Sequence, residues 1–210
     1  MSPRRTLTWA AVFALAFGYL EGAVVVYLRR LVYPDGFRFP LVALDPELVR
    51  VEIAREAATI LMLLGAAALA SADRVRRFGV FAFCFGLWDL GYYAALKLLL
   101  DWPASLLDWD VLFLIPLPWL SPVLAPVLVS LALIGAGAAL AGQPEGRDWS
   151  FLRPRDWWIE TAAGLVIIAS FLGSLPAVRD GAVSTSYPWW LFLVGWLGGL
   201  GWFAHRWRHR

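Results

Sequence analysis

Charged side chains stand inside apolar segments of the chain, at spacings that place them on common helical faces. Glu52, Arg55, Glu56 and Thr59 follow one another at i, i+3, i+4 and i+7, which is one face of an α-helix. Glu21 stands alone in an earlier apolar run. Charged groups are costly in lipid, so they usually face the interior of a helical bundle and find partners there. These residues are therefore expected to lie inside a bundle.

A third apolar segment carries Asp89, Tyr93 and Lys97 at i, i+4 and i+8, with Tyr92 beside them. Lys97 is the only lysine among 18 basic residues. A lysine is a compact charge whose pKa changes readily on burial, unlike that of an arginine. Two interpretations stay open for Lys97. It extends to the lipid headgroups from near a helix end, or it joins a buried ion pair or a substrate site.

The candidate residues share an expected position in the outer half of the first three apolar segments or at their outer rim. The candidates for substrate or ion binding are Glu21, Glu52, Arg55, Glu56, Asp89, Tyr92, Tyr93, Lys97, Asp108 and Asp110. Carboxylates bind protons and hard cations such as Mg²⁺, Ca²⁺ and Mn²⁺. The alternative is structural, because pairing between helices would hold the bundle in register. No residue is designated as catalytic.

Several chemistries are excluded by residue type. The only histidines are His205 and His209, which stand in an Arg-rich C-terminal segment. No haem or zinc site is therefore expected, no metal ligands are predicted, and the sequence specifies no cofactor. That basic segment is predicted to contact anionic lipid. The chain also lacks a Gly-rich phosphate loop, a G-x-S-x-G elbow and a C-x-x-C pair.

Composition and segment length predict how these residues are positioned. The 210 residues are 60% hydrophobic and 16% charged, against roughly 25% charged in a soluble domain. A helix crosses the hydrocarbon core with about 20 apolar residues. Six segments qualify, at 7–28, 51–71, 78–100, 120–141, 159–175 and 189–204. We therefore predict an all-α integral membrane protein, a single bundle of six transmembrane helices forming one polytopic domain over residues 1–210.

Arginine placement predicts the orientation, because basic residues gather in cytoplasmic loops. With the N-terminus inside, the inner side takes Arg4, Arg5, Arg74, Arg76, Arg77, Arg147, Arg153, Arg155, Arg206, Arg208 and Arg210. The outer side takes Arg29, Arg30, Arg38, Arg50 and Arg179. Both termini are therefore predicted to be cytoplasmic, in a cell membrane of the prokaryotic inner-membrane type. The 13 tryptophans include many that flank apolar segments, as in an aromatic belt.

The segment 101–126 interrupts this regularity with prolines at positions 103, 116, 118, 122 and 126. Proline removes a backbone donor and clashes inside a helix. Broken backbone at membrane depth must be buried by protein or line a cavity. The segment is predicted to be a broken or re-entrant outer segment before the fourth helix. A helix lying flat at the interface is the alternative.

Small residues recur at four-residue spacing, which lets helices approach closely in lipid. Ala10, Ala14, Gly18 and Gly22 form one such stripe, and Gly195 with Gly199 form a second pair. In size, helix number and the Ala10-x-x-x-Ala14 pair, the chain resembles the substrate-binding components of energy-coupling-factor transporters. That pair is similar to their docking motif.

Three functions fit this pattern. The first is binding or translocation of a small solute or ion. The second is an intramembrane carboxylate- or metal-dependent enzyme acting on a lipid-linked substrate, so whether the protein is an enzyme stays open. The third is a non-catalytic subunit or assembly factor of a membrane complex. The expected partners are the lipid bilayer, one of these ligands and, for the third function, other membrane subunits; a nucleic acid is not expected.

Overall fold

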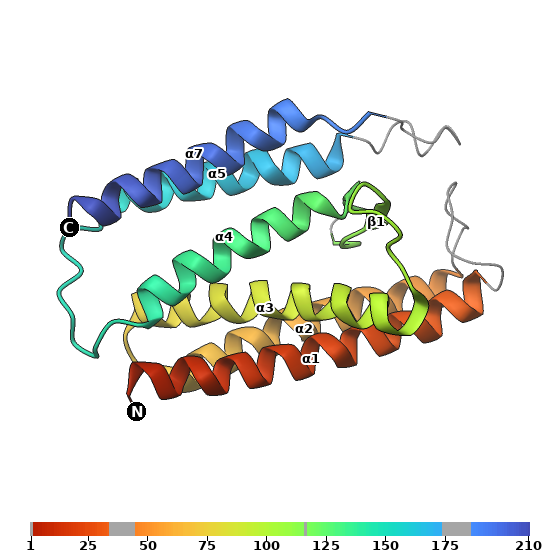
Figure 1. Ribbon diagram of the computed structural model, residues 1–210, viewed down its shortest axis with the longest axis horizontal. Coiled ribbons are helices and arrows are strands. Elements are labelled where there is room, and N and C mark those ends of the chain that lie inside the picture. The colour runs from red at the N-terminus through yellow and green to blue at the C-terminus, as the bar shows by residue number, and fades with distance from the viewer. Residues whose placement is uncertain (1, 34–44, 116, 174–185) are drawn as a thin grey trace. The chain divides into compact units, whose positions relative to one another are not determined.

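Six helices dominate the computed structural model, which describes residues 2–33, 45–115, 117–173 and 186–210. The helices are α1 (Pro3–Val32), α2 (Pro46–Ala70), α3 (Arg74–Leu100), α4 (Leu124–Ala141), α5 (Pro154–Leu172) and α7 (Trp189–Arg208) (Figure 1). The helical class is confirmed, and α1 to α4 are each long and apolar enough to cross a membrane. Six spans and the orientation stay predictions. Arg38 and Arg179, used for the orientation, lie outside the described residues.

Four of the helices, α1, α2, α3 and α5, begin earlier than the apolar segments predict, because polar residues or proline start them. Ser2 caps α1 by accepting a hydrogen bond from a backbone N–H, and Asp45 and Asp73 do the same for α2 and α3. Such side chains satisfy N–H groups that have no partner within the helix. Proline stands in the first turn of α1, α2 and α5, where its missing N–H costs nothing. Hydropathy does not detect these helix starts, because the residues that form them are polar or proline.

The Pro-rich segment is broken, as one of the two alternatives predicted. Its described residues contain no helix before Leu124 and instead form two short strands, β1 (Trp109–Val111) and β2 (Leu120–Pro122). The Leu112 N–H donates to the Trp119 carbonyl oxygen at 2.8 Å, next to this two-stranded sheet. The predicted fourth helix therefore starts four residues later than expected, and the flat interfacial helix is not found.

The described chain groups into two compact units. The first comprises Met1–Trp109 and Pro122–Glu145, and the second comprises Asp110–Ser121 and Gly146–Arg210. Each unit is described by itself, and a single membrane domain stays a prediction.

In the first unit, α3 packs against α1, α2 and α4, and Figure 1 shows it between α1 and α4. Glycine makes the α1–α3 approach close: a Cβ on Gly18 would lie 2.9 Å from the Tyr92 nitrogen, and one on Gly22 would lie 2.7 Å from the Ala95 Cβ. Ala14, on the same face, is completely buried. The small-residue stripe of α1 is therefore filled by α3, and so is the stretch that resembled a docking motif.

The second unit is built on the pair α5 and α7. A Cβ on Gly195 would lie 3.1 Å from the Ile167 nitrogen of α5, so this Gly-x-x-x-Gly pair also serves internal packing. One turn further along α5, Trp119 from the Pro-rich segment stacks on Phe171, with ring centroids 6.0 Å apart, and Phe171 stacks on Tyr187. Aromatic stacking therefore fixes the Pro-rich segment to α5.

Two glycine substitutions test the close approach of α1 and α3. Gly18→Ala should destabilise the protein by about 1–3 kcal/mol, because the new methyl group meets backbone that cannot move aside. Gly65→Ala is the matched control in α2, where an added Cβ meets nothing within 4 Å. Alanine there should be neutral or stabilising by about 0.5–1 kcal/mol. Thermal unfolding in detergent measures both, and equal midpoints for the two variants would contradict the packing described.

Candidate functional site

Arg55 of α2 is the centre of a group of charged side chains in the first unit. Its Nε and Nη2 atoms donate to Glu52 Oε2 at 2.9 Å and 2.8 Å. Its Nη1 atom forms an ion pair with Glu21 of α1. Each nitrogen of the guanidinium therefore faces a carboxylate, and the arginine links two helices through one planar group.

The acidic members of this group are buried. Glu21 is 6% exposed, and Glu52 and Glu56 are each 5% exposed. Thr59 Oγ1 donates to Glu21 Oε2 at 3.1 Å, which adds a second link between α1 and α2. The shared helical face predicted for the α2 residues is therefore the face that turns inward. We call Glu21, Glu52, Arg55, Glu56 and Thr59 the carboxylate cluster.

The cluster holds more acidic than basic side chains. Glu56 interacts electrostatically with Arg55, and so does Tyr92 of α3. One guanidinium thus contacts two carboxylates and interacts electrostatically with a third. In surroundings of low polarity, a charge that is not balanced by a neighbour is strongly unfavourable. A positive charge beside these carboxylates would therefore be favourable.

Asp89 and Tyr93, the other candidates on α3, have different partners. Ser130 Oγ of α4 donates to Asp89 Oδ2 at 2.7 Å, so Asp89 connects α3 with α4. Tyr93 is buried, and its ring lies 6.4 Å from that of Trp102. Ser130 was missed by the sequence analysis, because a serine among small apolar residues gives no signal of its own.

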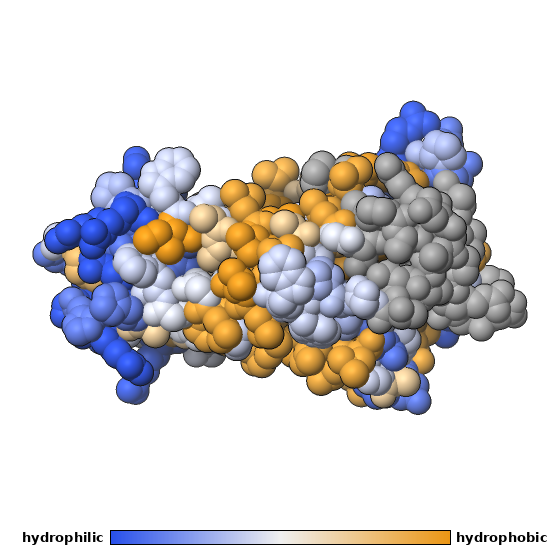
Figure 2. Space-filling view, turned by 90° about the horizontal axis from the view of Figure 1, so that it is seen from above, coloured by the Kyte–Doolittle hydropathy of each residue, from blue (hydrophilic) through white to orange (hydrophobic). Residues whose placement is uncertain are grey.

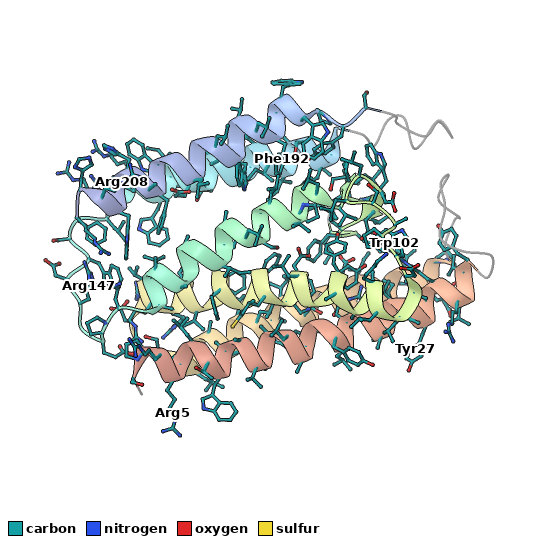
Figure 3. All side chains as sticks on the ribbon, in the orientation of Figure 1. Arg5, Tyr27, Trp102, Arg147, Phe192 and Arg208 are labelled. Atoms are coloured by element: carbon teal, nitrogen blue, oxygen red, sulfur yellow. The ribbon has the colours of Figure 1, made fainter. Side chains whose placement is uncertain are left out.

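Arg29 is predicted in an outer loop, but α1 continues to Val32 and includes it, and Arg29 is only 7% exposed. Its guanidinium carbon lies 3.8 Å from the centroid of the Trp102 ring, a cation–π contact. Figure 3 shows Trp102 beside the end of α1. The spacing of eight residues between Glu21 and Arg29 was the available signal that both share one face.

Lys97 belongs to a separate ion pair at the C-terminal end of α3. Its Nζ lies 2.6 Å from Asp101 Oδ1 and donates to the Pro103 carbonyl oxygen at 3.1 Å. Hydrogen bonding to Lys97 and its positive charge lower the pKa of the Asp101 carboxyl group below its ordinary value. Both side chains are at least half exposed. The structure therefore favours the first interpretation of Lys97, a charge that reaches the surface.

Asp108 and Asp110 organise the segment before α4. Asp108 Oδ2 accepts hydrogen bonds from the backbone of Ala104 and Ser105, at 2.8 Å and 3.2 Å. Asp110 is 2% exposed within β1. The Asp108 contacts are those of a turn.

No group of three or more His, Cys, Asp or Glu side chains arranged to hold a metal ion occurs among the described residues. Glu21 and Glu52 both face Arg55.

The chain matches no protein-family model, no curated protein and no solved structure. The site geometry alone therefore carries the functional argument.

A double-mutant cycle tests the link between α1 and α2. Arg55→Met should destabilise the protein by about 3–5 kcal/mol, because it leaves buried carboxylates without their cation. Glu21→Gln should cost less, since Arg55 keeps Glu52. The coupling energy between the two changes should be about 0.5–3 kcal/mol. Chemical unfolding in mixed micelles measures it.

Arg50→Met is the control for the loss of an arginine from α2, because Arg50 is exposed in the second turn of the same helix. Additive effects of Glu21→Gln and Arg55→Met would show that the two side chains do not interact in the folded protein.

Proposed function

We propose that the protein is an integral membrane protein whose carboxylate cluster binds a small monovalent cation, either an inorganic ion or the ammonium group of a small solute, as a step in its passage across the membrane. The observation that carries this proposal is the charge of the cluster, with three buried carboxylates and one guanidinium. The long apolar helices α1 to α4 support a location within a membrane. We further propose that both termini lie in the cytoplasm and that the membrane is a prokaryotic inner membrane.

Because Arg55 already pairs with Glu21 and Glu52, the cluster favours a ligand of positive charge. An anionic group would need N–H donors, but the guanidinium nitrogens already face Glu21 and Glu52. Carboxylate oxygens, in contrast, have several lone pairs each and can accept further donors. A ligand with positive charge and N–H or metal-ion character would therefore be stabilised where an anion would be repelled.

The pairing of Arg55 also argues against the alternative of an enzyme acting on a lipid-linked substrate. An enzyme of that kind would need a positive group to hold an anionic headgroup or an oxyanion, and Arg55 and Lys97 are the basic side chains among the candidate residues. Arg55 forms ion pairs with two carboxylates, and Lys97 forms an ion pair with Asp101 and a hydrogen bond with the Pro103 carbonyl oxygen. The positive groups that this chemistry would use are therefore engaged elsewhere.

Glu56→Gln tests cation binding. A cation at a hundred times its dissociation constant adds about 2.7 kcal/mol to the stability of the folded state. For a chain of this length, that raises the unfolding midpoint by roughly 5–10 °C. We expect one of Li⁺, Na⁺, K⁺ or ammonium, as chlorides, to raise the midpoint against N-methylglucamine chloride at equal ionic strength. Glu56→Gln should remove most of that rise.

Glu47→Gln is the matched control, because Glu47 is an exposed glutamate in the first turn of α2. It should keep the full rise. If none of the four cations raised the midpoint of the unaltered protein, or if Glu56→Gln and Glu47→Gln retained equal rises, the proposal would be wrong.

A further inference from the structure

Six arginines gather at one end of the α5–α7 pair in the second unit. They are Arg147, Arg153, Arg155, Arg206, Arg208 and Arg210, and we call them the basic end. Figure 3 shows Arg147 and Arg208 at this end. Figure 2 shows hydrophilic side chains there and a hydrophobic band along the middle of the view. The acidic side chains nearest to these arginines in sequence are Glu145, which pairs with Arg76, and Asp148, Asp156 and Glu160.

Among the described residues of the second unit, acidic side chains neutralise only part of this positive charge. Asp156 is buried and accepts hydrogen bonds from Arg206 Nε at 3.0 Å and Trp202 Nε1 at 3.2 Å. Asp148 accepts hydrogen bonds from Ser150, both from its backbone and from its hydroxyl group. Arg155 lies 3.8 Å from Asp156, but its side chain is 59% exposed. The internal acids therefore satisfy Arg206 and leave exposed arginines around it.

The helix dipoles do not account for the exposed arginines. α5 begins and α7 ends at the basic end, so positive and negative dipole ends meet there. Arg208, in the last turn of α7, is favourably placed, but Arg153 and Arg155 stand at the start of α5, where a cation is unfavourable. Positive charge at both helix ends points to an anion outside the chain.

Tryptophan side chains mark the depth at which this anion would lie. Trp157 is 38% exposed and Trp158 is 74% exposed, within the first turn and a half of α5. Trp207 is covered by Arg210, whose guanidinium carbon lies 3.8 Å from the ring centroid. Tryptophan is enriched at headgroup level, where its ring is apolar and its N–H is solvated. Exposed arginines together with the exposed Trp157 and Trp158 match a layer of headgroups.

We propose that the basic end binds anionic phospholipid headgroups in preference to zwitterionic ones. The guanidinium groups would face the phosphates, the tryptophans would lie among the glycerol and headgroup atoms, and the apolar middle of α5 and α7 would lie in the hydrocarbon. Each arginine near an anionic surface changes the local preference on the order of fivefold. This inference does not depend on the ligand of the carboxylate cluster.

Lipid retention tests the preference directly. The purified full-length protein is equilibrated in detergent with equal amounts of phosphatidylglycerol and phosphatidylcholine, and the lipids it retains are counted by native mass spectrometry. The unaltered protein should retain an excess of phosphatidylglycerol. The double change Arg208→Gln with Arg210→Gln should lower the ratio by about fivefold or more. Raising the salt concentration should lower it too, because the arginines are exposed.

Arg30→Gln with Arg50→Gln is the matched control. Both are exposed arginines, at the last turn of α1 and the second turn of α2, and their loss removes the same charge from the first unit. This variant should keep the ratio of the unaltered protein. Equal retention of the two lipids by the unaltered protein, or equal loss in both double variants, would overturn the proposal. Helical circular dichroism establishes that each variant is folded.

Discussion

The ion pair between Glu21 and Arg55 is the constraint on which the arrangement of the first unit depends. A carboxylate among apolar side chains is stable only if a positive group or several donors face it. Glu21 obtains both from α2, as a guanidinium and a threonine hydroxyl. Because Arg55 also faces Glu52, one side chain fixes the rotation of α2 about its own axis and its height along α1. The inward orientation of Glu56 follows from that rotation.

Close packing of the helix backbones holds together the helices that the ion pair does not link. Helices in lipid gain little from burying apolar surface against one another, so contact at short range must hold them together. Gly18 and Gly22 allow α1 to approach α3 closely, and the hydrogen bond from Ser130 to Asp89 links α3 to α4. In the first unit, close packing at Gly18 and Gly22 and a hydrogen bond between Ser130 and Asp89 thus hold the neighbouring helices against α3. The second unit uses the same glycine packing, with aromatic stacking at one end of α5 and α7.

The helices and the inward face of α2 could be predicted from sequence, because apolar length and the i, i+3, i+4 spacing are local properties. The partner of Glu21 could not, since it depends on how α1 and α2 are rotated against one another. Hydropathy also misplaced Arg29, because α1 extends beyond its apolar stretch to include that arginine, whose contact with Trp102 is non-local. Lys97 was ambiguous for a related reason: only the turn after α3 brings Asp101 and Pro103 to its ammonium group.

The unequal sharing of Arg55 has an evolutionary consequence. Losing Glu21 leaves the arginine with Glu52, whereas losing Arg55 strands both carboxylates at once. Substitutions should therefore be accepted in a fixed order, with Glu21 or Glu52 becoming neutral before Arg55 can be replaced. Among homologues of this chain, an arginine at position 55 beside a single glutamate should be common, and two glutamates without that arginine should be rare. The residues found at positions 21, 52 and 55 of related chains would then show the order in which these substitutions occurred.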